Sequence, residues 1–559
     1  MNEKSPSAKY MRISLLLFSL SVTLGTASIA CSELKLGAYG LIHSLPPTFF
    51  VALFLLALSF LITVKFNVKN RAFLFIHIIA LVLLLYLLPA LIEKTARFAP
   101  AYLVYGSTDY VLQHGHIEPS VSVYMKWPGI TLLGVSVSEI AGLSPSTLLI
   151  GFPIAFELIC LPLLYSILNR VSRNQHLVWI GLWLYFVAGW INRAYYSGQA
   201  YGFLLFLVIV FVILLSARRK GEIRPTERGA IPIILVVLFL AIAASHLLSS
   251  IVAGVSLVIL YILFRIFKVG GARSIGFMIP VFLVAALVWL FLLGGDAFFR
   301  DILQGPSGRW ELFNFGAIFK RTFQVPFSGG AEHATIMLLR AIYTGAFCAL
   351  ALFGLFNMVI KKKMHFDSTV MLGLLAGACS VIVLVGSYGG EIVYRAFEFS
   401  LLFLAFFAAK SLGSKALSIP LVIFLIVSPV LFVASAYANE KADYISPGEI
   451  KGVEFFHDHV TDDAEVHSLT PRIWRSRNIE LNHWRPLLLE SVCSTGGNTT
   501  RSDEKEHYFL LGERDVDSRI FLGGELEVEI EDLREMFECS CRAKIYSGDG
   551  FDLYKAMNN

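Results

Sequence analysis

Residues 230–268 read AIPIILVVLFLAIAASHLLSSIVAGVSLVILYILFRIFK. The stretch holds two apolar runs, 230–246 and 248–268, and its first Lys or Arg is Arg265, close to its end. Each run has about 20 residues, the length that a helix needs to cross the hydrocarbon core of a bilayer. The sequence therefore predicts two membrane-spanning helices joined by a tight turn near His246.

Apolar runs of this kind recur along the chain, and the hydropathy criterion predicts about thirteen spans. They cover approximately residues 11–31, 47–66, 72–92, 145–168, 177–192, 200–217, 230–246, 248–268, 275–294, 335–359, 369–388, 395–411 and 417–437. The 559-residue chain is 56% hydrophobic and 16% charged, against roughly 25% charged residues in soluble proteins. This composition predicts a polytopic α-helical membrane protein, and nothing in it indicates binding to nucleic acid.

Basic residues at the ends of the runs predict the orientation. Clusters such as Lys65 with Lys69, Arg218–Lys220 and Lys361–Lys363 fall at every second connection, so the positive-inside rule makes these connections and the N-terminus cytoplasmic. We therefore expect a multi-pass protein of the plasma membrane, with the long polar connections outside. The first run also has the basic start and small-residue end of a signal peptide, so its cleavage stays open as an alternative.

The chain divides into three predicted parts: an N-terminal pair of transmembrane helices (1–70), a transmembrane module (71–437) with outer loops 93–144 and 296–334, and an extracytoplasmic α/β domain (438–559). In the last part, Ser446-Pro447 resembles a helix start, and we expect a helix to about His459. Strands are expected at 464–469, 508–511, 525–530, 542–546 and 551–555. The pairing of Cys493, Cys539 and Cys541 stays open.

Polar residues concentrate at the predicted outer ends of the spans. Residues 105–129, YGSTDYVLQHGHIEPSVSVYMKWPG, are interpreted as a loop that lines a site at the outer face. Its acid Asp109 is the main candidate, because no residue nearby in the sequence is an evident partner. Ionisable groups at membrane depth are costly and usually pair or function. The predicted topology places the other candidates at the same level: His116, Lys126, Arg193, Tyr196, Gln199, His246, Glu391 and Arg395.

Structural alternatives exist for several of these residues. Glu391 and Arg395 are four residues apart, which also suits a local ion pair on one helix. His246 also suits a hydrogen bond between helices. Arg193 and Lys126 also suit positions where a long side chain reaches the headgroup level.

The order of Asp109, Gly115-His116-Ile117 and Trp127-Pro128-Gly129 resembles the first outer loop of the integral-membrane GT-C glycosyltransferases, in particular their poorly characterised prokaryotic, many of them archaeal, members. Residues 195–203 resemble a Ser-Pro-Gln-type turn, with Gly198 in place of the Pro. Residues 387–399 resemble a late-span motif of the same proteins. The resemblance covers roughly residues 70–440 and implies a GT-C-like fold.

The resemblance also implies a reaction. A sugar would move from a polyprenyl-phosphate carrier to an extracytoplasmic acceptor (protein, lipid or glycan), by inverting attack with Asp109 as general base. Fixed cations such as Arg395 would stabilise the leaving phosphate. The expected substrate- and phosphate-binding residues are Arg395, Glu391, His246, Arg193, Gln199, His116, Lys126 and Tyr196. Membrane lipids are the other expected partners.

This sequence departs from the family in its acidic motifs. Ser107 and Thr108 precede Asp109 and Tyr110 follows it, so there is no Asp-x-Asp motif. We therefore expect no metal or other cofactor, although a divalent metal stays open. The Trp-Trp-Asp signature of oligosaccharyltransferases is also missing, which disfavours transfer to Asn.

Two other functions stay open. A transporter or flippase of lipid-linked saccharide would need ionisable groups deep in several spans, and the mid-span positions read as almost purely apolar. A non-catalytic GT-C-fold protein that binds envelope glycans or a partner would keep the fold without using Asp109 as a base.

Overall fold

The helices that the apolar runs predict are present in the computed structural model of the chain. The structure describes residues 6–120, 122–191, 194–216, 225–268, 272–291, 316, 320, 330–361, 364–385, 391–413, 415–460, 464–468, 484–486, 506–512, 530–538, 542–548 and 551–556. Each predicted run is mostly helical over its described residues, with run 72–92 divided into two helices and run 177–192 helical only to Ala188. A backbone surrounded by lipid must satisfy its hydrogen bonds within its own segment.

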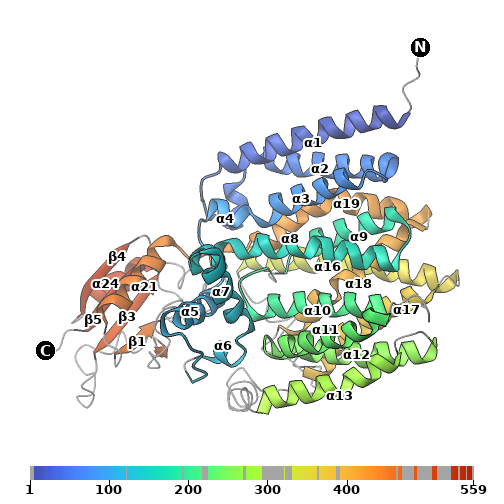
Figure 1. Cartoon of the computed structure of the whole chain (residues 1–559). Coiled ribbons are helices and arrows are strands. Elements are labelled where there is room, and N and C mark those ends of the chain that lie inside the picture. The colour runs from blue at the N-terminus through green and yellow to red at the C-terminus, as the bar shows by residue number, and fades with distance from the viewer. Residues whose placement is uncertain are drawn as a thin grey trace.

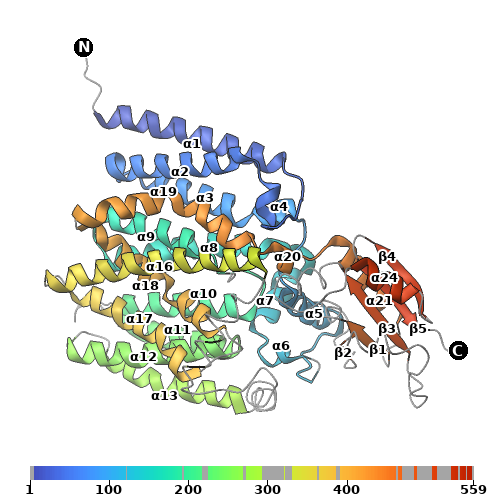
Figure 2. The same cartoon turned by 180° about the vertical axis from the view of Figure 1, so that it is seen from behind.

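These helices lie side by side in one bundle (Figure 1 and Figure 2). They are α1 (Pro6–Ala30), α2 (Pro47–Asn67), α3 (Arg71–Tyr86) followed by α4 (Leu88–Ile92), α8 (Pro145–Val171), α9 (Gln175–Ala188), α10 (Gly198–Ser216), α11 (Pro225–Ala243), α12 (Leu247–Ile266), α13 (Ala272–Trp289), α16 (Ala331–Ile360), α17 (Phe366–Val385), α18 (Ile392–Lys410) and α19 (Lys415–Tyr437). Short 3₁₀ turns occur at η1 (Leu41–Ser44) and η7 (Ser411–Gly413).

The protein is a multi-pass membrane protein, but the predicted number of thirteen spans is not confirmed. Within the described residues, 8 helices are long and apolar enough to cross a membrane: α1, α2, α8, α10, α12, α16, α18 and α19. The apolar segments of the other apolar helices are shorter, with 10–17 residues each.

The prediction of a loop at residues 105–129 is wrong for its first part. Residues up to His114 belong to helix α5 (Ala99–His114), which ends at Gly115 in the left-handed conformation (φ 73°). Two further helices follow, α6 (Val123–Lys126) and α7 (Gly129–Ala141). The buried residues Ala101, Val104, Thr108 and Val111 recur at helical spacing along α5. Gly106, Ser107 and Thr108 suggested a turn because these residue types are common in turns, but burial of this stripe outweighs that local preference.

The C-terminal segment forms the expected small α/β unit at one end of the bundle (Figure 1). Its helices are α20 (Glu440–Asp443), α21 (Pro447–His459) and α24 (Ile530–Glu538). Its strands are β1 (Glu465–Ser468), β2 (Trp484–Pro486), β3 (His507–Gly512), β4 (Arg542–Gly548) and β5 (Phe551–Ala556), in the order β2-β1-β3-β5-β4. Strands β2, β1 and β3 are parallel, β5 pairs antiparallel with β3, and β4 pairs antiparallel with β5. Residues 525–529 of the strand expected at 525–530 lie outside the described residues, and Ile530 begins α24. Cys493, Cys539 and Cys541 also lie outside them, as does most of loop 296–334.

Four of the strand predictions and the helix at 447–459 are confirmed. Ser446 caps that helix, since its side chain accepts a hydrogen bond from the backbone N–H of Glu449 at 3.0 Å. The C-terminal unit packs on α5, because Tyr102 and Val104 share one buried apolar cluster with Ile445, Val453 and Phe456. The helix that carries Asp109 therefore lies between the bundle and the C-terminal unit.

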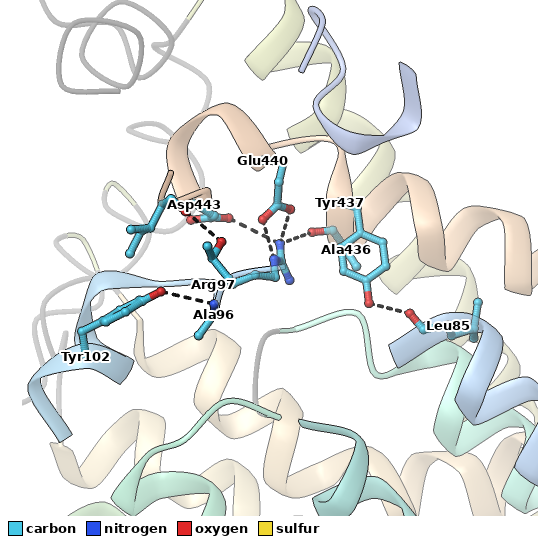
Figure 3. Close-up of polar contacts among 10 residues, drawn as sticks. Leu85, Ala96, Arg97, Tyr102, Ala436, Tyr437, Glu440 and Asp443 are labelled. Atoms are coloured by element: carbon cyan, nitrogen blue, oxygen red, sulfur yellow. Dashed lines mark hydrogen bonds and ion pairs between the residues drawn. The ribbon is translucent and has the colours of Figure 1, made fainter. Parts of the chain in front are cut away.

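Arg97 joins α5 to the segment that follows α19 (Figure 3). Its Nε and Nη2 atoms donate to the two carboxylate oxygens of Glu440 at 2.5 and 2.6 Å, and Nη2 also donates to the Ala436 carbonyl at 3.1 Å. Asp443 lies 3.8 Å from the same guanidinium. The side chain of Arg97 is 11% exposed and that of Glu440 is fully buried, so this ion pair is an internal connection between the two parts.

Glu93 adds a further carboxyl group to this buried cluster. Both of its carboxyl oxygens are buried, and the side chain lies next to that of Glu440. Burial, and after it the charge of Glu440, raises the pKa of Glu93 well above its usual value. Burial also raises the pKa of Glu440 to about 6, although Arg97 opposes that shift. The cluster therefore holds three acids (Glu93, Glu440 and Asp443) against Arg97 and the nearby Arg340, and Glu93 and Glu440 retain their protons to unusually high pH.

Candidate functional site

A cavity of about 340 Å³ lies at the end of the bundle that is next to the C-terminal unit, which we call the domain end. Two arginines line it, Arg340 of α16 and Arg395 of α18, together with the acids Glu391 and Asp443. Its aromatic lining is Phe98, Trp190, Tyr195 and Tyr394. Cations in a hollow with aromatic walls, at the ends of apolar helices, suit an anionic group attached to a lipid.

Arg395 is held by two carboxylates of its own helix turn. Its Nη2 atom lies 2.5 Å from Oε2 of Glu391, and its Nη1 atom lies 3.7 Å from Oε2 of Glu398. The local pair between Glu391 and Arg395, left open on the sequence, is thus present. Glu391 is 55% exposed whereas Glu398 is 1% exposed. The exposed partner can move away when an anion arrives, while the buried one keeps the guanidinium in place.

Gln199 and His246 belong to the same cluster. The Gln199 side-chain amide donates to the carboxylate of Glu398. His246 caps α12, with Nδ1 accepting from the Ser249 backbone N–H at 3.3 Å. Burial, and after it the charge of Arg395, lowers the pKa of His246 to about 3. The imidazole is therefore neutral near pH 7 and carries its proton on Nε2, since Nδ1 is an acceptor. His246 can donate a hydrogen bond to a substrate but adds no positive charge.

Arg340 is a site residue that the sequence reasoning missed. Its Nε atom donates to the Ser435 carbonyl at 2.7 Å, and its guanidinium lies 4.9 Å from the ring centroid of Trp190. These contacts orient the guanidinium in the wall of the cavity. The available signal was an arginine inside the apolar run 335–359, which is costly unless the side chain pairs or functions.

Asp109 lies on α5, half-buried, and accepts a hydrogen bond from Nε2 of Gln113 at 2.8 Å. The expectation that no residue nearby in sequence pairs with Asp109 is therefore wrong, because Gln113 is one helical turn further along. A helix brings residues four apart onto the same side, and the loop interpretation had hidden this neighbour. The amide orients one carboxylate oxygen.

Tyr196 connects the turn of α5 next to Asp109 with the wall of the cavity. Its hydroxyl bonds with Oγ1 of Thr108 at 2.8 Å and approaches the Ile130 carbonyl at 3.4 Å. Burial raises the pKa of Tyr196 to about 12, so this hydroxyl stays protonated. The preceding residue, Tyr195, lines the cavity. Tyr196 is thus better placed to position α5 than to bind phosphate directly.

The described lining of the cavity includes Arg395 and Glu391 but neither Asp109 nor His246. Pro100 of α5 lines the cavity, and Asp109 is further along the same helix by about 13 Å, from a rise of about 1.5 Å per residue. The structure therefore groups Arg395, Glu391, Gln199 and His246. Thr108, next to Asp109, bonds with Tyr196, and Tyr195 lines the cavity, so Asp109 lies beyond the described lining.

The remaining candidates contribute less to this geometry. His116 is exposed, and its Nδ1 atom bonds with the His114 carbonyl at 3.0 Å. Lys126 ends α6, and its carbonyl accepts from Trp289 at 3.0 Å. Arg193 lies outside the described residues. Over the part of the chain that the structure describes, no three His, Cys, Asp or Glu side chains gather as a metal site requires, and the metal-independent base stays a prediction.

Two buried ionisable side chains correct the expectation that mid-span positions are almost purely apolar. Glu157 lies near the middle of α8 and is fully buried. His77 of α3 is also fully buried and bonds with Oγ of Ser59 at 2.7 Å. A single polar residue inside a long apolar run changes the average hydropathy little, so hydropathy alone does not reveal Glu157 and His77.

Replacing Gly134 by Ala should lower the thermal stability, because the added Cβ would lie 1.8 Å from the Tyr196 hydroxyl. Overpacking of this kind costs about 1–3 kcal/mol. Thermal unfolding in detergent would measure the effect. Gly151→Ala is the matched control on α8, since no atom lies within 4 Å of its added Cβ. Equal stability of the two variants would contradict a packed role for Tyr196.

No family model and no curated protein matches the chain. Among solved structures, the chain is similar to the oligosaccharyltransferase of Archaeoglobus fulgidus tethered to an acceptor peptide. The identity is 12% and the TM-score is 0.49, over 75% of this chain and 64% of that chain. This chain thus spans less than two thirds of the length of that protein.

The chain is also similar to ArnT from Cupriavidus metallidurans. The structure bound to undecaprenyl phosphate is 9% identical with a TM-score of 0.41, over 87% of this chain and 99% of that chain. The apo structure is 10% identical with a TM-score of 0.39, over 88% of this chain and 100% of that chain. Both proteins are membrane glycosyltransferases of the GT-C superfamily, the family that the motifs around Asp109 resemble.

Proposed function

We propose that the protein is a membrane glycosyltransferase that moves a sugar from a polyprenyl-phosphate carrier to an acceptor outside the cytoplasm, with Asp109 as general base. The observation that carries this proposal is the cavity at the domain end, where Arg340 and Arg395 lie among aromatic side chains at the ends of apolar helices. The resemblance of residues 105–129, 195–203 and 387–399 to GT-C motifs supports it.

The two arginines suit the phosphate of the carrier. When the sugar leaves, the phosphate gains negative charge, and fixed donors that meet this charge lower the barrier. A guanidinium presents several N–H groups in one plane and can hold a phosphate with two hydrogen bonds. Glu398 fixes Arg395 and Ser435 fixes Arg340, so both are positioned before the substrate binds.

The carrier and its sugar would use different parts of the cavity. A polyprenyl chain needs an apolar path from the bilayer, and Trp190, Tyr394 and Ile191 line the cavity on the bundle side. Phe98 and Asp443 line the side next to the C-terminal unit. In this arrangement the sugar points away from the bilayer, toward the side where the acceptor arrives.

Asp109 would then act on the acceptor. The acceptor hydroxyl oxygen forms a bond to the anomeric carbon, and the bond from that carbon to the phosphate oxygen breaks with both electrons going to the phosphate. The hydroxyl proton moves to the Asp109 carboxylate, whose other hydrogen bond comes from Gln113. Attack on the face opposite the phosphate inverts the anomeric centre.

Mass spectrometry of envelope glycans and glycolipids tests this function directly. Cells that lack the protein should lose one glycosylated product and regain it when the wild-type gene is returned. The purified protein in detergent, given a polyprenyl-phosphate sugar and an envelope extract, should release free polyprenyl phosphate. Neither a transporter nor a non-catalytic binder would cleave the polyprenyl-phosphate sugar. The proposal would be overturned if the purified protein released no polyprenyl phosphate and cells lacking the protein kept all their glycosylated products.

Replacing Arg395 by Lys should lower the rate of transfer by about 10–100-fold, because Lys keeps the charge but loses the planar pair of donors. Release of polyprenyl phosphate by the purified variant would measure it. Arg170→Lys, at the opposite end of the bundle, is the control and should keep the wild-type rate. Wild-type activity of Arg395→Lys would remove this residue from the phosphate site.

A further inference from the structure

A second cavity, of about 840 Å³, lies at the opposite end of the bundle. It is formed where α2, α16 and α18 end and where α9 and α17 begin, beside α19. This end faces away from the C-terminal unit (Figure 1 and Figure 2). The cavity shares no described lining residue with the one around Arg395, and its volume suits a ligand of lipid-headgroup size or larger.

The walls of this cavity are aliphatic and close to the bilayer. Its lining includes Leu61 and Val64 of α2 and Val422 and Leu425 of α19. Val422 is 38% exposed, and its helix neighbours Ile419 and Ile423 are 68% and 57% exposed. Exposed aliphatic side chains on a spanning helix face lipid tails. The cavity therefore adjoins a lipid-facing helix surface.

Three lysines from three helix ends meet at this cavity: Lys65 of α2, Lys361 beyond α16 and Lys410 of α18. The described lining contains no Asp or Glu, while Asn174, His176 and His365 add further polar groups. Outside the lining, Asp367 interacts with Lys410 and also with Arg170 and Arg173. The described lining thus brings three lysines together with no carboxylate among them.

We propose that this cavity binds an anionic membrane lipid, whose phosphate lies among Lys65, Lys361 and Lys410 and whose aliphatic tail lies against α2 and α19. Clustered lysines at the end of spanning helices attract acidic headgroups, and the apolar walls contribute to the binding of the tail. A soluble phosphate would meet the same lysines but leave most of the 840 Å³ without a partner. The proposal does not depend on the reaction at the domain end.

Native mass spectrometry of the full-length protein tests this lipid site. The protein is released from nanodiscs that contain equal amounts of phosphatidylglycerol and phosphatidylcholine, and the lipids that stay bound are counted. We expect phosphatidylglycerol to be retained in preference. The combined variant Lys65→Gln, Lys361→Gln and Lys410→Gln should weaken that retention at least about tenfold, since each lysine near a headgroup counts for several-fold in affinity.

Lys69→Gln is the matched control, because Lys69 is an exposed lysine on the same end of the chain and does not line the cavity. It should keep the wild-type retention. Gel filtration and thermal unfolding check that the triple variant is folded, and single Lys→Gln variants replace it if it is not. Equal retention of the two lipids, or equal loss in the Lys69 variant, would overturn the proposal. So would stabilisation by inorganic phosphate alone to the same extent as by phosphatidylglycerol, which would assign the site to a soluble anion.

Discussion

The Asp109→Asn variant should fold normally and lose transfer almost completely. Asn has the shape of Asp and its amide oxygen can still accept the hydrogen bond from Gln113, so α5 is undisturbed. It cannot take a proton from an acceptor hydroxyl, and general-base catalysis contributes about 10²–10⁴-fold to a rate. We expect the purified variant to release polyprenyl phosphate at least about 100-fold more slowly than the wild type, and cells carrying it to lack the product.

Two variants on the same stretch separate the chemistry from the position of the helix. Glu118→Gln removes an exposed carboxylate that bonds with Ser120, and it should keep the wild-type rate. Gln113→Ala removes only the amide that orients Asp109 and should lower the rate less than Asp109→Asn does. Transfer at the wild-type rate by a folded Asp109→Asn protein would exclude Asp109 as the base and would leave the arginine cavity as the surviving part of the proposal.

The membrane-spanning architecture could be predicted because it depends on local composition. An apolar run of about 20 residues in a bilayer has few options besides a helix, and each predicted run is helical over most of its described residues. The helix at 447–459 was predictable for a similar reason, since its N-cap Ser446 and the residue it caps, Glu449, are only three positions apart. Helix α5 was not, because its apolar stripe is narrow and its Gly, Ser and Thr residues also suit a turn.

The candidate site could be predicted only where its contacts are local. The pair between Glu391 and Arg395 is separated by one helical turn and could be read from the spacing. The bond from Gln199 to Glu398 joins residues 199 positions apart, and the bond from Arg97 to Glu440 joins residues 343 positions apart. Such pairs depend on how the helices pack, which the order of residues along one segment does not specify. Arg340 gave a local signal, but only the structure shows that it lines the same cavity as Arg395.

The Arg97→Gln variant should be strongly destabilised. Arg97 forms both hydrogen bonds to the fully buried carboxylate of Glu440, so its removal leaves a buried negative charge next to Glu93 and Asp443. Breaking a buried ion pair from one side costs about 3–5 kcal/mol. Thermal unfolding in detergent, with gel filtration to follow aggregation, would measure the loss. Because this pair joins α5 to the segment after α19, proteolysis between the bundle and the C-terminal unit should also become faster.

Glu93→Gln removes an acid from the same cluster, so its expected effect on stability at high pH is opposite to that of Arg97→Gln. The pKa values of Glu93 and Glu440 are raised in the folded protein, mainly by burial, so the fold retains protons that the unfolded chain releases near its usual value of about 4.5. The stability that these protons contribute is fully present below that pH and is lost as the pH rises through about 6 and beyond. The wild type should therefore melt at lower temperature at pH 8 than at pH 5. Glu93→Gln should reduce this dependence of the melting temperature on pH and should not be less stable than the wild type at pH 8.

If Glu93→Gln destabilised the protein as much as Arg97→Gln at pH 8, Glu93 would be an ionised partner of Arg97, and the excess of acids would not be the source of the pH dependence.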